Sequence, residues 1–246
     1  MKFCISKFVL LACLLIVPNA WAAVSWDTST VSDNADSDTS DSFSHTIGSG
    51  SNVYAGACVV TRGGSSITVS SVNIGGSAAT QLGTADTTSQ GGGIIRVEIW
   101  GRAMGSTTGA VTINPTVSAA DRFRTTAFSL FGVNQATPTG TANSAVGSST
   151  TLTATVTSAV NELVLGCLGV ATGTSGWTVG SGETQRWLNS TDTNNTVEMG
   201  MTEPGAASVS IVPTWTTGHY SGLVAVPFKE ATATTAKTLM LMGVGN

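Results

Sequence analysis

The sequence has little charge and few of the residues that favour helices. Asp, Glu, Lys and Arg make up 10% of its 246 residues, against about 25% in ordinary globular chains. Ser, Thr, Gly and Ala dominate instead, so the composition favours strands over helices. The formal net charge is −4. A chain without a basic excess lacks the electrostatic footprint of proteins that bind nucleic acid or anionic membranes, so neither is expected as a partner.

Histidine and cysteine are also rare, which limits metal and triad chemistry. The chain has two His and four Cys. His45, His219, Cys58 and Cys167 stand at no metal-ligand spacing, so no metal site is expected from them. No serine lies in a Gly-x-Ser-x-Gly elbow, and serine hydrolase chemistry is therefore not expected.

The cluster of acidic residues near the N-terminus raises the question of a calcium-binding site. Asp33, Asp36, Asp38 and Asp41 lie within nine residues of one another, and carboxylate oxygens suit this ion. The cluster lacks the Gly and Glu positions of an EF-hand loop. We therefore interpret residues 23–42 as a solvated acidic segment, and no cofactor is predicted.

The first 22 residues have the three parts of a secretory signal peptide. Lys2 and Lys7 precede an apolar run, and Ala20-Trp21-Ala22 places small residues at the two positions that signal peptidase inspects. The run is too short to span a bilayer as a helix. We expect cleavage after Ala22, no membrane span in the mature chain, and a secreted, periplasmic or cell-surface location. Cleavage would remove two Lys and no acid and leave a net charge of −6.

Four segments recur in the same order in two halves of the chain. Their offsets shrink from 109 to 97 residues, as expected if loops shortened while strands were kept. The pairs are 52–60 with 161–170, 96–100 with 196–200, 111–115 with 209–213, and 128–131 with 225–228. The sequence therefore predicts an internal duplication, with halves at about 43–134 and 151–230.

Apolar residues alternate with polar ones in most of these segments, which is typical of strands with one face on a core. The number of such segments predicts an all-β domain over 43–230 with ten to twelve strands. Two arrangements fit: one two-sheet jelly roll in which the halves interleave, or two tandem immunoglobulin-like sandwiches. The first is preferred because the second half is short, and it requires strand pairing between the halves. Residues 231–246 are expected to form an Ala/Thr linker and a short apolar tail.

Several of these segments resemble a known group of proteins. The resemblance rests on residues 161–166 (NELVLG), Val97–Trp100, 131–135 (FGVNQ) with Thr137-Pro138, and 177–186 (WTVGSGETQR). Together they resemble bacterial and phage-associated extracellular β-sandwich proteins, which have jelly-roll folds of the concanavalin-like lectin and glucanase kind. The resemblance implies a jelly roll and suggests binding or attachment rather than turnover. It supplies no functional residues.

Cys58 and Cys167 occupy equivalent places in the two repeats. After export they could form a disulfide, or they could remain two buried thiols, because both lie in the middle of an expected strand. Glu98 and Glu198 are equivalent in the same way. We interpret them as a shared outward-facing position rather than as a catalytic pair, and no catalytic residue is predicted.

Aromatic and polar residues in the second half are the weak candidates for ligand binding. They are Trp177, Trp187, Tyr220, Gln185 and Arg186, a mixture that suits a ligand with many hydroxyl groups. The alternative is that each aromatic ring fills one end of the sandwich.

The function expected from these observations is a secreted, non-catalytic binding or adhesion module with a glycan or cell-surface polymer as its partner. The alternative is a structural subunit of a surface layer, fibre or virion-like appendage, for which homo-oligomers would form. The third hypothesis is a glycan-cleaving enzyme.

Overall fold

The computed structural model describes residues 23–32, 35–87, 94–171, 175–190 and 196–232. All elements of regular secondary structure in these ranges are β-strands, and they form large antiparallel sheets that pack together. The predicted all-β, two-sheet sandwich is therefore confirmed. Within these ranges there is no helix long and apolar enough to cross a membrane. The expected signal peptide, Asp33 and the apolar tail lie outside the described residues.

The first half of the chain builds one sheet around the 23-residue strand β9. The end of β9 pairs with β1 on one side and β4 on the other, and its beginning pairs with β3 and β5. The strands are β1 (Ser25–Val31), β2 (Ala35–Ser40), β3 (Phe43–Ile47), β4 (Val53–Gly63), β5 (Val69–Ile74), β6 (Ser77–Ala78), β7 (Thr80–Asp86), β8 (Ile94–Gly105) and β9 (Gly109–Phe131).

The second half builds a five-stranded sheet in the order β10-β16-β12-β14-β13, and β11 and β15 form a separate pair. The strands are β10 (Asn143–Gly147), β11 (Ala154–Val156), β12 (Leu163–Val170), β13 (Thr184–Asn189), β14 (Val197–Pro204), β15 (Val209–Ile211) and β16 (Ser221–Phe228). The described strands outnumber the ten to twelve expected, partly because β1 and β2 lie in the segment assigned outside the sandwich.

The two halves share one topology, as the repeat predicts. The order β1-β9-β4-β8-β7 in the first sheet corresponds to β10-β16-β12-β14-β13 in the second. Asn52 and Asn161, which open the repeated motif, both have positive φ, at 52° and 71°. Asn tolerates this left-handed conformation better than most residues. Its recurrence therefore marks the turn into β4 and into β12.

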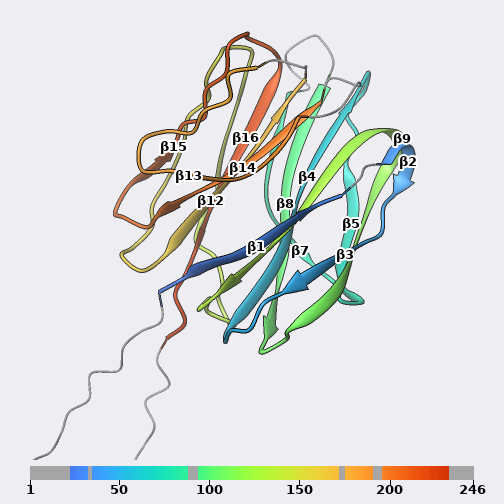
Figure 1. Ribbon diagram of the computed structural model, residues 1–246. Helices are drawn as coiled ribbons and strands as arrows, with labels where there is room; N and C mark the ends of the chain where they lie inside the picture. Colours follow the sequence, from blue (N-terminus) through green and yellow to red (C-terminus); the bar gives the residue numbers. More distant parts are fainter. Residues whose placement is uncertain (1–22, 33–34, 88–93, 172–174, 191–195, 233–246) are drawn as a thin grey trace, which may run out of the picture.

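The halves do not interleave. In the described residues, every paired strand has its partners in its own half, so the strand pairing expected between halves is wrong. The two sheets instead pack face to face, with β12 and β16 on one side and β4, β7 and β8 on the other (Figure 1). Isolated bridges such as Thr139↔Phe228 connect the segment between the halves to the second sheet.

Three cores result from this packing. The inner core fills the space between the two sheets and includes Tyr54, Phe128, Leu165 and Phe228. An outer core lies within each half, on the other face of its sheet. The strand β4 is thus buried on both faces from Val53 to Thr61, and β12 is buried throughout. This explains why these runs are apolar without alternation.

The segment 23–42 is part of the sandwich rather than a solvated tail. β1 and β2 both pair with β9, and the amide of Val24 donates to the carbonyl of Asn161 at 2.8 Å. Asp38 is exposed, but Asp41 accepts hydrogen bonds from the Ser32 hydroxyl and the Ser42 amide. The edge strand that β1 supplies completes the order shared by the two halves.

Asn161 provides a test of the turn into β12. We expect Asn161→Val to lower the free energy of unfolding by about 1–2 kcal/mol, because a β-branched residue is strained at positive φ. Asn161→Gly is the matched control and should stay within about 0.5 kcal/mol of the wild type. Urea unfolding of both variants measures the difference. Equal stability of the Val variant would contradict the left-handed turn.

Candidate functional site

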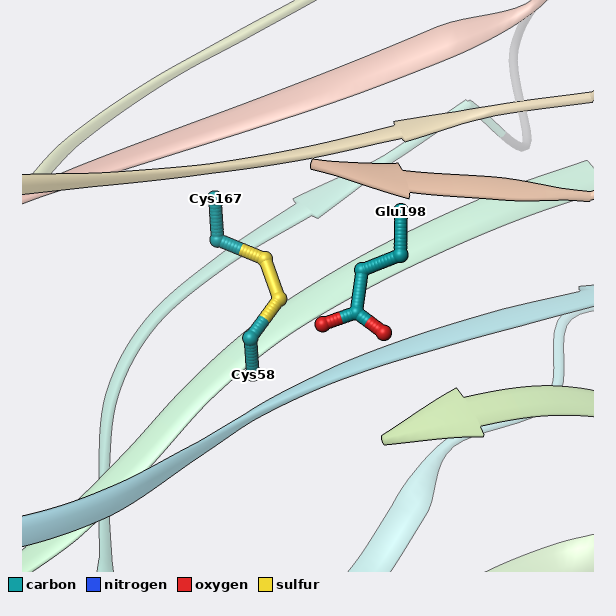
Figure 2. A group of neighbouring side chains, drawn as sticks. All are labelled: Cys58, Cys167 and Glu198. Atoms are coloured by element: carbon teal, nitrogen blue, oxygen red, sulfur yellow. A yellow bond between two sulfur atoms is a disulfide. The ribbon is translucent and has the colours of Figure 1, made fainter. Parts of the chain in front are cut away.

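The inner core contains a disulfide at its centre. Cys58 of β4 and Cys167 of β12 are fully buried and joined to each other, with their Cα atoms 6.3 Å apart (Figure 2). Each cysteine lies on the face of its strand that is turned toward the other half, so equivalent positions of the repeat meet across the core. The bond closes a span of 109 residues. In the chain-entropy model a loop of this size contributes on the order of 4–5 kcal/mol.

Glu198 of β14 lies beside this disulfide and is fully buried (Figure 2). Its Oε1 accepts a hydrogen bond from the indole Nε1 of Trp187 at 3.1 Å, whereas Oε2 has no hydrogen-bond partner. Burial raises the pKa of Glu198 to about 8, and the nearby Thr126, Trp187 and the positive charge of Arg124 oppose the shift. Glu198 is therefore mostly a neutral acid at pH 7.

Cys58, Cys167 and Glu198 bring their sulfur and carboxylate atoms within 4.8 Å of one another. Such a set could ligate a thiophilic ion only if both sulfurs were thiolates. In the disulfide the sulfurs are bonded to each other, and a single carboxyl remains. The residues present in this form do not fit a metal ion.

Gly200 makes room for Trp187 in the inner core. The two residues are directly opposed across β13 and β14, and a Cβ on Gly200 would lie 2.2 Å from the indole ring. The ring also stacks on Trp26 of β1, with the ring centroids 6.0 Å apart. The indole is thereby fixed where its Nε1 meets the carboxyl of Glu198. Sequence reasoning missed Trp26 because it lies in the segment that was assigned outside the sandwich.

Glu98 and Glu198 are not equivalent positions. Ile99 lies opposite Cys58, whereas Gly200 lies opposite Cys167, so the true offset between these strands is 101 rather than 100. A slip of one residue moves a side chain to the other face of a strand. Glu198 therefore faces the inner core, and Glu98 faces the outer side of the first sheet.

Glu98 is buried as well, so the expected outward-facing position is wrong for both residues. Its carboxylate accepts from the Val69 amide at 3.3 Å, Gln81 Nε2 at 2.7 Å and Trp100 Nε1 at 2.8 Å, and also from Arg96 Nε. Arg96 in turn bridges to Asp86 at 2.7 Å. The first sheet separates this satisfied ionic group from Glu198, so the two carboxyls form no catalytic pair.

His45 belongs to a buried polar network that holds β1, β3 and β9 together. The Ser129 hydroxyl donates to Asp27 at 2.7 Å, so His45 Nε2 must donate to Ser129 Oγ at 3.0 Å. The other ring nitrogen then accepts from Thr30 at 2.9 Å. Burial lowers the pKa of His45, opposed by the charge of Asp27. This direction of donation is the reverse of a base that activates a nucleophile.

The five candidate binding residues of the second half are not gathered into one platform. Trp187 is in the inner core and Tyr220 packs against it, whereas Trp177 stacks on Trp215 at the outer core, on the other face of the sheet. Gln185 is exposed. Arg186 is half-buried: its guanidinium lies 5.0 Å from the Trp26 ring centroid, and its Nε donates to Thr202 at 2.7 Å. All three aromatic rings thus pack against a core, and those of Trp177 and Tyr220 stay partly exposed.

The segment 132–143, which joins the halves, lines three surface hollows in succession. The first, of about 210 Å³, includes Asn134 and Gln135; the second, of about 340 Å³, includes Gln135 and Thr139; the third, of about 490 Å³, includes Thr141 and Asn143. Hydroxyl and amide groups line all three, and the second hollow also has apolar walls, formed by Leu82, Ala103 and Pro138. The first hollow is also lined by Asn52, Ala136, Ala231 and Thr232. The second is also lined by Tyr54, Thr80, Leu82, Gly101, Arg102, Ala103 and Pro138. The third is also lined by Ala142, Thr155, Val156 and Thr157.

Comparisons with protein-family models, with curated proteins and with solved structures find no match to this chain.

The disulfide is expected to be a main source of stability. The double variant Cys58→Ala, Cys167→Ala should lose about 4 kcal/mol of unfolding free energy, because the unfolded chain regains the freedom of a loop of about 100 residues. Urea unfolding measures the loss, and alkylation of the unreduced wild type reports the free thiols. A wild-type chain that alkylates fully at Cys58 and Cys167 would contradict the bridge.

Glu198 should make stability depend on pH. Its pKa rises from 4.5 in the unfolded chain to about 8 in the folded one, so its stabilising effect is complete below about pH 4.5 and is lost as the pH rises through 8. Glu198→Gln keeps the acceptor and cannot ionise. We expect this variant to be more stable than the wild type at pH 9, on the order of 4–5 kcal/mol, and to differ little at pH 4.

The control for this experiment is Glu98→Gln. It removes the charged acceptor of Arg96 and should destabilise the protein at neutral pH. Urea unfolding at pH 4, 7 and 9 with the disulfide intact compares the three proteins. A Glu198→Gln variant that is less stable than the wild type at pH 9 would show that the buried carboxylate is charged and paired.

Proposed function

We propose that the protein is an exported, non-catalytic binding or adhesion module whose ligand is a glycan chain. The observation that carries this proposal is the row of three hollows along residues 132–143. Their combined lining offers hydroxyls and amides, with Arg102 as its one charged residue. Such a surface matches a neutral polymer with many hydroxyl groups, which exchanges hydrogen bonds with water for similar bonds with protein.

The placement of the hollows suits a ligand that is long and thin. They follow a single continuous segment, and the first two share Gln135. The Gln135 side chain is held by the Gly105 amide at 2.8 Å and by the Val133 carbonyl at 2.8 Å. A lining that is already fixed loses little freedom on binding, which favours affinity.

Export is part of the same proposal. The disulfide supports it, because such bonds persist in oxidising compartments and are rare in the cytosol. The predicted signal peptide at residues 1–22 agrees with this. The resemblance to extracellular jelly-roll proteins stays a prediction that points in the same direction.

Screening of the mature protein on an array of neutral and acidic polysaccharides tests the proposal. We expect binding to a neutral polysaccharide and a loss of affinity of about ten-fold in the double variant Thr141→Ala, Thr157→Ala, from about 0.5–1.5 kcal/mol for each hydrogen bond. Both hydroxyls are exposed in the third hollow, so their removal should leave the fold intact.

Thr112→Ala is the matched control, since Thr112 is an exposed strand threonine that lines none of the three hollows. It should bind like the wild type. Binding that survives the double variant unchanged would place the ligand elsewhere. If no polysaccharide on the array binds the protein, a glycan is excluded as the ligand.

A further inference from the structure

Two polar oxygen atoms in the inner core are fully buried and lack hydrogen-bond partners. They are Oε2 of Glu198 and the hydroxyl oxygen of Thr126, and neither has a partner in the part of the chain that the structure describes. Buried polar groups in proteins are nearly always hydrogen-bonded, and an ion is one of the explanations for an exception. The two groups therefore point to a role beyond packing.

Both groups lie beside the Cys58–Cys167 pair. Thr126 of β9 is directly opposed to Cys58 of β4 in the strand register, so the two side chains leave the first sheet on the same face. Cys167 of β12 and Glu198 of β14 extend from the second sheet, and the carboxyl group of Glu198 points toward the sulfur atoms (Figure 2). The two sulfur atoms and a carboxylate oxygen lie within 4.8 Å of one another. Four strands thus bring soft and hard donor atoms to one point.

The two sulfurs and the carboxylate match the ligands of a thiophilic metal ion once the disulfide is reduced. Zinc takes four ligands in a tetrahedral arrangement, with bonds of about 2.3 Å to sulfur and about 2.0–2.2 Å to oxygen, so its ligand atoms are roughly 3–4 Å apart. The observed spacing is compatible with this arrangement. Reduction separates the sulfurs and makes both of them available, and the fourth ligand position is left beside the unpaired hydroxyl of Thr126.

The charges of such a site cancel. Two thiolates and the Glu198 carboxylate carry three negative charges, whereas a divalent ion and the guanidinium of Arg124 carry three positive ones. Arg124 is buried, and its positive charge acts on Glu198. Buried charges are tolerated where they are paired or coordinate a metal, and a bound cation holds its ligands in the deprotonated form. The inner core can therefore accommodate the ion without a net charge.

We infer that Cys58, Cys167 and Glu198 form a binding site for a thiophilic divalent ion such as zinc when the two cysteines are reduced. All three ligands are buried in the folded chain, so the ion is taken up as the two sheets come together. Thiols prevail in reducing compartments and disulfides in oxidising ones. The site does not depend on the proposed glycan ligand.

The metal-bound form and the disulfide form exclude each other. Oxidation by a small disulfide removes two electrons from the two thiolates and joins their sulfur atoms. The oxidant accepts these electrons and leaves as two thiolates, and the ion is released. The same three residues thus hold either a metal ion or a covalent bridge between the halves.

Refolding of residues 23–246 from urea, with a phosphine reductant and either cobalt or zinc, tests the site. Cys58 and Cys167 are the only cysteines of this chain. We expect one ion per chain, a sulfur-to-cobalt charge-transfer band, and a higher melting temperature of the reduced protein with zinc than without it. The disulfide form, treated in the same way without reductant, should bind neither ion.

Glu198→Gln tests the third ligand, because it keeps the size of the side chain and removes its negative charge. It should weaken zinc binding about ten-fold or more, since a direct ligand contributes at least as much as an outer-shell partner. Asp38→Asn is the matched control, because it removes one carboxylate that is exposed on β2. This control should bind zinc like the wild type.

A reduced wild type without the cobalt charge-transfer band would overturn the inference, and this readout holds even if a variant fails to fold. Equal zinc affinity of Glu198→Gln and the wild type would also overturn it, because the two thiols alone would then bind the ion. The same holds if zinc binds without raising the melting temperature of the reduced protein, since the ion would then prefer the unfolded chain.

Discussion

The contact between the inner faces of the two sheets is the constraint on which the rest of the structure depends. Each half covers only the outer face of its main sheet, with β3, β5 and the beginning of β9 in one half and β11 and β15 in the other. The inner faces present large apolar side chains such as Tyr54, Phe128 and Phe228, which would be exposed in a separated half. The halves are therefore two copies of a topology that form one sandwich, and the Cys58–Cys167 bond fixes them in contact.

The inner core is not uniformly apolar, and the disulfide helps to explain how this is tolerated. Glu198, Thr126 and Arg124 all lie in it, and Glu198 Oε2 and the Thr126 hydroxyl have no hydrogen-bond partner. Burying an unpaired polar group costs roughly 1–3 kcal/mol, and a neutral carboxyl costs far less than a carboxylate. Because its pKa rises to about 8, Glu198 can stay neutral near pH 7. The stabilisation expected from the long disulfide loop is of a size to offset these terms.

Much of the fold could be predicted because its signals are local. Alternation identified the strands, and the Asn that opens each motif recurs because the same left-handed turn precedes β4 and β12. The face of the sheet on which each side chain lies could not be predicted, because it depends on the register of pairing between distant strands. Matching Glu98 with Glu198 differs from the true equivalence by one residue, and this reversed the environment of both carboxyls. Trp26 and β1 were missed for a similar reason: acidic residues that follow them in sequence suggested a solvated segment, but pairing with β9 decides their place.

The same packing determines where a ligand can bind. The inner core is filled by aromatic stacking among Trp26, Trp187 and Phe128, so Trp187, one of the three aromatic residues suggested for binding, is engaged inside the protein. What remains for recognition is the perimeter, where the segment between the halves leaves polar groups open to solvent. This place is anchored on the doubly buried strand β4 and on the chain that follows β9. If the proposed function is right, a surface whose supports are this rigid would recognise its ligand by fixed hydrogen-bonding groups rather than by movement of aromatic side chains.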